Sequence, residues 1–205
     1  MSLTLRPYQS GAIQGIYNYF HEATGNPLVV IPTAGGKSLV MATFVEGVLK
    51  AYPDQRILIV THVRELIEQN HAELKKLWPQ APAGIYSAGL KQRDIGARIL
   101  FAGIQSIHKR VYDVQQCDLV LIDEAHLIPR SSNTTYRRFL SELGRLNPQM
   151  KVIGLTATDH RLALVDDAFV RLLAVNGAGA TRESVRMSLN EDKVDKTSPF
   201  FSSLS

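Results

Sequence analysis

Two short groups of residues in this chain have the types and the spacing needed for chemistry on phosphate. The first, residues 32–38, reads Pro-Thr-Ala-Gly-Gly-Lys-Ser and follows an apolar run at 28–31. The second is the carboxylate pair Asp123-Glu124, which follows the apolar run at 119–122. A glycine-rich turn that opens a helix directs backbone N–H groups at phosphate oxygens, and the helix dipole favours their negative charge. Because adjacent carboxylates at a strand end can hold a divalent cation and activate water, the two groups together predict hydrolysis of a nucleotide.

The residues of the first group have separate expected roles. Lys37 is expected to reach the β- and γ-phosphates, and the Ser38 hydroxyl is expected to ligate Mg²⁺. Gly35 and Gly36 are expected to let the backbone approach closely and to adopt positive φ. The general pattern G-x-x-x-x-G-K-[ST] begins with a glycine where this chain has Ile31. The alternative interpretation is a Gly-Gly turn that precedes a lysine by chance.

The second group ends a strand that we expect to be buried on both faces and to finish at the carboxyl edge of a parallel sheet. There Asp123 would hold Mg²⁺ through its water shell, and Glu124 would polarise the water that attacks the γ-phosphate. Ionised acids at the end of an apolar strand are unfavourable unless a cation or hydrogen bonds compensate them. The alternative is that Asp123 and Glu124 cap the helix that follows, but the phosphate loop upstream favours the metal site.

Four further segments match, in order along the chain, the motifs of one family. With the Asp-Glu-Ala-His run at 123–126, the chain resembles the first RecA-like domain of a superfamily 2 helicase with a DEAH box. Within that superfamily, the segment from Arg6 to the Ser-Ala-Gly-Leu run at 87–90 looks most like RadD-type bacterial DNA-repair ATPases and related phage helicases. The matching segments are 5–9 (the adenine-side motif), 60–66 (the motif Ia region), 102–107 (a later strand-end motif) and 154–158 (motif III).

The resemblance implies ATP and Mg²⁺ as ligands. Gln9 would read adenine through its carboxamide, and Tyr8 would either stack on the base or only pack beside it. His126 would couple the metal site to motif III, although without the motif it reads as a residue at a helix start. Without the family, Thr156 and Thr158 read as a strand end. The implied residues are Arg6, Gln9, Thr33, Ala34, Gly35, Gly36, Lys37, Ser38 and Leu39 for the nucleotide; Lys37, Asp123 and Glu124 for catalysis; Ser38 and Asp123 for the metal; and His126, Thr156 and Thr158 for coupling.

A nucleic-acid partner is implied by the same resemblance. The formal net charge is +4, which fits an electrostatic attraction to a phosphate backbone but also fits an ordinary solvated surface. Polar groups at strand ends would follow the sugar-phosphate backbone of a single strand without reading its bases. We expect single-stranded or forked DNA rather than RNA. The implied contacts are Thr61, His62, Arg64, Gly89, Gln105 and Ser106.

Alternating apolar strands and helical segments predict an α/β fold, a P-loop RecA-like three-layer αβα domain with a mostly parallel sheet. This domain is expected to cover residues 1–160. Residues 161–205 are expected to form a short helix, within 162–173, and a flexible polar tail, and no segment resembles a second RecA-like domain. Strands are predicted at 28–31, 57–60, 98–101, 119–122 and 151–155, and helices at 8–21, 37–49, 64–78 and 134–143.

Composition argues against several other classes of protein. The single cysteine, Cys117, excludes an internal disulfide and a zinc site built from a cysteine cluster. No apolar run is long enough to cross a membrane, and the N-terminus lacks the pattern of a signal peptide. The sequence therefore predicts a cytoplasmic protein without a membrane partner.

Two functions remain open at this point. The first is the ATP-binding and hydrolysing motor domain of a DEAH-box DNA helicase or translocase in DNA repair, recombination or phage replication. In the family a second domain supplies arginine fingers, which raise the rate of hydrolysis by about 10³–10⁵. A partner chain or self-association would therefore have to provide these arginines for fast turnover. The alternative is a nucleotide-gated module that binds single-stranded nucleic acid, with little hydrolysis or unwinding of its own.

Overall fold

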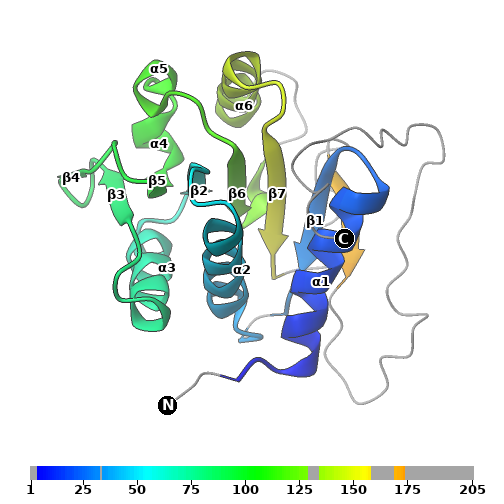
Figure 1. Cartoon of the computed structure of the whole chain (residues 1–205). Helices are drawn as coiled ribbons and strands as arrows, with labels where there is room; N and C mark the ends of the chain where they lie inside the picture. The colour runs from blue at the N-terminus through cyan, green and yellow to red at the C-terminus, as the bar shows by residue number, and fades with distance from the viewer. Residues whose placement is uncertain (1–3, 33, 129–133, 158–168, 174–205) are drawn as a thin grey trace.

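The computed structural model describes residues 4–32, 34–128, 134–157 and 169–173. Within these residues, one sheet of eight strands forms the middle layer, and helices cover both of its faces (Figure 1). Two predicted site residues, Thr33 and Thr158, lie outside the described residues. The three-layer α/β architecture confirms the predicted fold class.

The sheet is parallel except for one short edge strand, which runs antiparallel to its neighbour. The strand order is β4-β3-β5-β2-β6-β7-β1-β8, so strands that are distant in sequence become neighbours. The strands are β1 (Asn26–Val30), β2 (Ile57–Thr61), β3 (Ala83–Ser87), β4 (Gln92–Arg93), β5 (Ile99–Gly103), β6 (Leu119–Asp123), β7 (Lys151–Thr156) and β8 (Phe169–Leu173).

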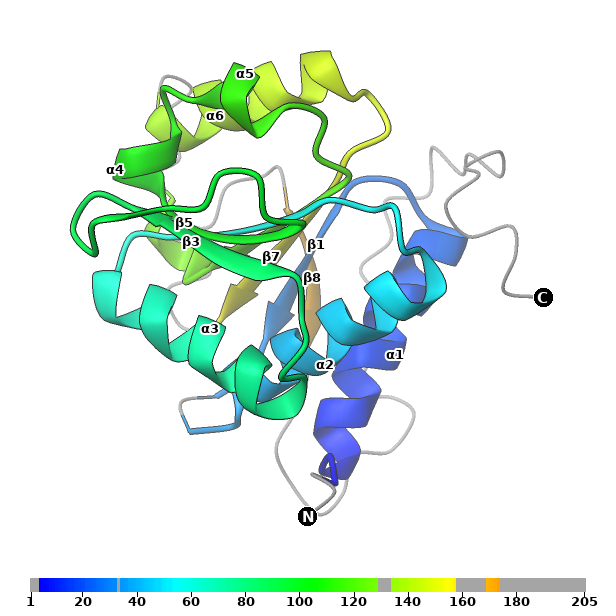
Figure 2. The same ribbon diagram turned by 60° about the vertical axis from the view of Figure 1, so that its left-hand side comes forward.

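The helices divide into two groups on opposite faces of the sheet (Figure 2). Helices α1, α2 and α3 pack on one face, and the shorter α4 and α5 lie with α6 on the other. The central strands serve both cores, because Ile57 and Ile59 of β2 face the first group while Leu58 and Val60 face the second. The helices are α1 (Pro7–Glu22), α2 (Lys37–Ala51), α3 (Arg64–Leu77), α4 (Ile104–Ile107), α5 (Val111–Val114), the 3₁₀ turn η1 (Ala125–Leu127) and α6 (Thr135–Leu146).

Each strand and helix predicted between residues 8 and 155 is present, with ends that differ by a few residues. The prediction of a helix over 162–173 is wrong at 169–173, which form β8. This strand pairs in parallel with β1, from Asn26 opposite Phe169 to Val30 opposite Leu173. The backbone of β1 thereby gains hydrogen-bonding partners on the side away from β7, which a helix could not supply. No helix in the described part of the chain is long and apolar enough to cross a membrane.

Candidate active site

The phosphate loop and the carboxylate pair meet at one edge of the sheet because β1 and β6 run in the same direction. Only β7 separates the two strands, with Val30 opposite Thr156 and Asp123 opposite Leu155. Two interstrand spacings correspond to about 10 Å, which a lysine side chain and a phosphate group can bridge between them. The carboxyl edge of the sheet therefore carries both predicted groups within reach of one ligand.

The loop that precedes α2 has left-handed backbone at two positions, and one of them is not a glycine. Gly36 has φ of +75° and Ala34 has φ of +64°. Gly35, where we also expected positive φ, does not adopt it. A glycine is needed there for space, because a Cβ at position 35 would lie 2.7 Å from Cγ2 of Ile31 and 2.8 Å from the carbonyl oxygen of Pro32.

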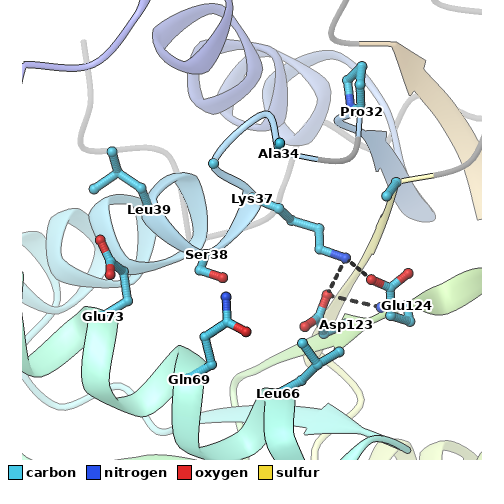
Figure 3. A pocket seen from close by; sticks show the side chains of 12 residues that line it. Pro32, Ala34, Lys37, Ser38, Leu39, Leu66, Gln69, Glu73, Asp123 and Glu124 are labelled. Carbon is cyan, nitrogen blue, oxygen red and sulfur yellow. Dashed lines mark hydrogen bonds and ion pairs between the residues drawn. The ribbon is translucent and has the colours of Figure 1, made fainter.

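The side chain of Lys37 extends from the start of α2 to both carboxylates (Figure 3). Its Nζ lies 2.9 Å from Oδ1 of Asp123 and also pairs with Oε1 of Glu124. Asp123 is buried, so this cation supplies the charge compensation that an acid at a strand end requires. Glu124 has left-handed backbone, with φ of +56°, and makes no side-chain capping hydrogen bond to the turn that follows. Its side chain is thus directed at the site rather than used as a helix cap.

A residue that the sequence did not suggest, Asn70 of α3, joins the two predicted metal ligands. Its Oδ1 accepts a hydrogen bond from Oγ of Ser38 at 2.7 Å, and its Nδ2 donates to Oδ2 of Asp123 at 2.7 Å. A hydroxyl and a carboxylate held on one amide form an oxygen donor set that fits Mg²⁺. Among the described residues no cluster of three or more His, Cys, Asp or Glu side chains could hold a metal ion by itself.

A cavity of about 350 Å³ opens over these residues. One wall is formed by the phosphate loop and the start of α2, including Leu39, and the opposite wall by α3 (Figure 3). The residues of α3 that line the cavity are Leu66, Gln69 and Glu73, and none of them was predicted as a site residue. The volume is in the range of small-molecule sites in proteins.

The first turn of α1 supports the phosphate loop. The hydroxyl of Tyr8 donates to the carbonyl oxygen of Gly35 at 2.8 Å, and Nε2 of Gln9 donates to the same oxygen at 2.9 Å. Oε1 of Gln9 accepts from the backbone N–H of Arg6 at 2.8 Å, which closes the first turn of α1. Gln9 is buried, so in this conformation its carboxamide holds the loop, while the prediction that it reads adenine stays a prediction. Of the two alternatives for Tyr8, this structure shows packing and a loop contact.

Two of the predicted coupling residues, His126 and Thr156, meet beside Glu124. Nδ1 of His126 is 2.8 Å from Oγ1 of Thr156 at the end of β7 and 3.2 Å from Oε2 of Glu124. A single imidazole therefore touches both the carboxylate pair and the strand that carries motif III. The contact is of the kind that the resemblance predicted for His126 and Thr156.

The predicted nucleic-acid contacts gather at the carboxyl ends of three adjacent strands, β3, β5 and β2. Arg64 and Gln105 are exposed. Gly89 lies next to Arg64, because a Cβ on Gly89 would be 3.3 Å from Cδ of Arg64. Oγ of Ser106 accepts from the backbone N–H of Ala88 at 2.9 Å, which ties the β5 end to the β3 end. Arg64, Gly89 and Ser106 therefore lie close together despite their separation in sequence.

Thr61 and His62 differ from the expectation of direct contact. Thr61 is only 2% exposed, and its Oγ1 accepts from the backbone N–H of Val63, so the hydroxyl shapes the turn. His62 packs edge-to-face on Tyr136, with ring centroids 4.8 Å apart. The pKa of His62 is lowered, mainly by burial and to a smaller extent by the nearby His126. A hydrogen bond to the Leu127 backbone acts in the opposite direction but has a smaller effect on this pKa. Burial, and then the Asp123 carboxylate, raise the pKa of Tyr136.

Comparison with solved structures identifies the class of the domain. The fold superposes on the helicase domain of Pyrococcus furiosus Hef with a TM-score of 0.61 at 22% identity, covering 82% of this chain and 38% of that one. It superposes with the same TM-score on the Sulfolobus solfataricus SWI2/SNF2 ATPase core in complex with dsDNA, at 18% identity, covering 78% of this chain and 33% of that one. Both likenesses are below 25% identity and show the fold alone, which this chain shares with these helicase and ATPase cores.

The sequence itself gives the family. Residues 2–161 match the protein family described as type III restriction enzyme, res subunit. The chain belongs to that family. It is also 31% identical over 182 residues to the putative ATP-dependent helicase IRC3 of Saccharomyces cerevisiae, a match that covers 81% of this chain. The chain spans only 26% of the length of IRC3.

Proposed function

We propose that this chain is the ATP-binding and hydrolysing motor domain of a DEAH-box DNA helicase or translocase. The observation that carries the proposal is the convergence of Lys37, Ser38, Asp123 and Glu124 on one cavity at the carboxyl edge of the sheet. A module that only binds nucleic acid has no chemical need for a lysine, a hydroxyl and two acids in this arrangement. The 31% identity to the putative ATP-dependent helicase IRC3 supports the same assignment.

The residues of the chain divide the reaction between them. When ATP binds, the Nζ of Lys37 turns from the two carboxylates to the β- and γ-phosphate oxygens, and the N–H groups at the start of α2 bind the same phosphates. Ser38 and Asp123 would hold Mg²⁺, and the ion would supply positive charge that offsets the charge of the phosphates. Once Lys37 has moved away, Oε1 of Glu124 is free to accept the proton of the attacking water. The water oxygen bonds to the γ-phosphorus as the bond between that phosphorus and the bridging oxygen breaks, so ADP keeps the bridging oxygen and inorganic phosphate is released.

Action on DNA, and a role in DNA repair, recombination or phage replication in the cytoplasm, belong to the proposal. The SWI2/SNF2 core, which has a similar fold and was solved with dsDNA, supports the DNA assignment by analogy of fold. Arg64, Gly89, Gln105 and Ser106 would bind the strand backbone at the ends of β2, β3 and β5. The polar character of this surface suits contacts to sugar and phosphate without base specificity.

A second candidate function is a nucleotide-gated binding module that turns over slowly by itself. Among the described residues that line the cavity, Lys37 is the only lysine or arginine. A cationic finger from elsewhere typically raises the rate of such sites by about 10³–10⁵. We therefore expect that a partner chain, a further domain or a second copy of this chain completes the site for fast turnover.

The deciding experiment measures steady-state ATP hydrolysis with Mg²⁺, with and without single-stranded DNA, at several protein concentrations. The wild-type chain is compared with Glu124→Gln and with Glu68→Gln, a matched change at an exposed glutamate on α3. We expect Glu124→Gln to lower the rate by about 10²–10⁴, the usual contribution of a general base, without loss of ATP binding.

The outcomes separate the two candidates. Turnover stimulated by DNA and lost in Glu124→Gln alone supports a motor, and a specific activity that rises with protein concentration indicates that a second copy completes the site. ATP binding without turnover in any variant supports the binding module. A wild-type chain that neither binds nor hydrolyses ATP would refute both candidates.

A further inference from the structure

The buried amide of Asn70 has no evident role in the packing of α3. The buried positions of this helix are Ile67, Asn70 and Leu74, which share one face at spacings of three and four. Asn70 is 1% exposed. Asparagine is a weak helix former, and an apolar side chain would serve the core better at this position. A buried amide at this position is therefore expected to have hydrogen-bonding partners that an apolar side chain could not serve.

The hydrogen bonds of Asn70 fix the orientation of the amide. An ionised Asp123 can only accept, so the group that faces its Oδ2 at 2.7 Å must be the Nδ2 donor. Oδ1 is then left to face Oγ of Ser38, also at 2.7 Å, and it can only accept. It follows that the proton of the Ser38 hydroxyl points at Asn70.

This orientation prepares both predicted metal ligands. A hydroxyl ligates a cation through a lone pair, so its proton must be donated elsewhere, and Oδ1 of Asn70 is the acceptor in this structure. Asp123 is held in the same way, with Oδ2 bound to Asn70 and Oδ1 facing Lys37 and the N–H of Glu124. Groups that orient metal ligands in this way commonly contribute 10- to 100-fold to metal affinity.

We propose that Asn70 is a positioning residue that sets the Ser38 hydroxyl and the Asp123 carboxylate for Mg²⁺–ATP. This inference rests on the proposed function of the site, because it assigns the way in which the metal ligands are held. Asn70 is not among the residues that line the cavity. Its effect is on the Mg²⁺ dependence of nucleotide binding, and it acts through Ser38 and Asp123.

The test measures the affinity of the full chain for a fluorescent ATP analogue over a Mg²⁺ titration and, separately, in EDTA. Asn70→Ala removes both hydrogen bonds, and Asn70→Leu removes them while keeping the side chain large enough to fill the space. Asn70→Asp keeps the acceptor for Ser38 but loses the donor to Asp123. Glu68→Ala, an exposed change on the same helix, is the matched control.

We expect Asn70→Ala and Asn70→Leu to need about 10- to 100-fold more Mg²⁺ for half-maximal binding, with affinity in EDTA within about 2-fold of wild type. Asn70→Leu is expected to stay folded, because an apolar side chain suits the buried position and Asp123 keeps Lys37 and the N–H of Glu124 as partners. Asn70→Asp is expected to weaken Mg²⁺–ATP binding too, since its carboxylate faces that of Asp123.

Two results would overturn the inference. One is an unchanged Mg²⁺ requirement in Asn70→Ala and Asn70→Leu. The other is an equal loss of binding with Mg²⁺ and with EDTA, together with a lower unfolding temperature in both variants, which would assign Asn70 a purely structural role. If the wild-type chain binds the analogue under neither condition, the proposed function fails first, and that result is distinct from both.

Discussion

Ala34 carries a backbone strain that a single substitution should relieve. Its φ of +64° lies in the left-handed region, which costs a residue with a Cβ roughly 1–2 kcal/mol. Ala34→Gly removes this strain but makes the unfolded chain more flexible, which offsets about 0.4–1 kcal/mol. The free energy of unfolding should therefore rise by about 0.5–1 kcal/mol. For a chain of this length that corresponds to an increase in Tm of about 1–4 °C.

The neighbouring Gly36 provides the reverse experiment. It also has left-handed backbone, with φ of +75°, and a Cβ there would lie 2.4 Å from Nε2 of Gln9. Gly36→Ala thus adds the strain that Ala34→Gly removes, and it also displaces the Gln9 carboxamide from the loop. We expect a loss of at least 1–2 kcal/mol in the free energy of unfolding, so the two variants should shift Tm in opposite directions.

The assay is thermal unfolding of the nucleotide-free chain, followed by circular dichroism, with denaturant unfolding to obtain the change in free energy. Nucleotide is left out because a ligand that binds the folded state would add its own stabilisation. A lower Tm for Ala34→Gly, or a higher one for Gly36→Ala, would refute the reasoning from backbone strain. An equal shift of the two variants in the same direction would refute it as well.

Two further predictions concern the support of the loop and the pH dependence of stability. Tyr8→Phe should weaken Mg²⁺–ATP binding by about 2- to 5-fold, because the Gly35 carbonyl keeps its bond from Gln9, whereas Gln9→Ala should weaken it more. A higher Kd for Mg²⁺–ATP in Tyr8→Phe than in Gln9→Ala would contradict this account. Burial lowers the pKa of His71 below its ordinary value of 6.5, so the unfolded chain binds the proton more readily and stability falls as the pH drops below 6.5. Denaturant unfolding between pH 7 and pH 5 should show a shallower fall for His71→Gln, and identical curves would contradict it.

The sequence was most informative where strands end. The apolar runs before residues 32–38 and before Asp123 are long enough to mark strands, and the residues after them face one edge whatever the order of strands. That geometric rule is the reason why Lys37, Asp123 and Glu124 could be assigned to one site without knowledge of the sheet. The same rule brought Arg64, Gly89 and Ser106 close together.

Other features depend on tertiary contacts that no local pattern records. The strand β4 has two residues, and β8 is defined by its pairing with β1 rather than by its own periodicity. Asn70 reads as an ordinary polar residue of a helix until β2 and β6 bring α3 against Asp123. A polar residue at the spacing of Ile67 and Leu74 was the one available signal, since such a position is expected to be apolar. Position 35 is another feature that depends on tertiary contacts. A glycine is required there because Ile31 and Pro32 leave no space for a Cβ, and not because of the backbone angle of Gly35.

The charges in the cavity determine how the nucleotide must enter. One ammonium, that of Lys37, lies between two carboxylates, so these three groups carry one net negative charge before ATP arrives. If Lys37 moves to the phosphates alone, the buried Asp123 loses a partner whose attraction is on the order of 4 kcal/mol at an effective dielectric constant of 20. Asp123 avoids that loss by exchanging the ammonium for Mg²⁺, so nucleotide and metal should bind together. Asn70 is uncharged and can keep its bond to Asp123 through the exchange, which is why an amide suits this position better than a further acid or base.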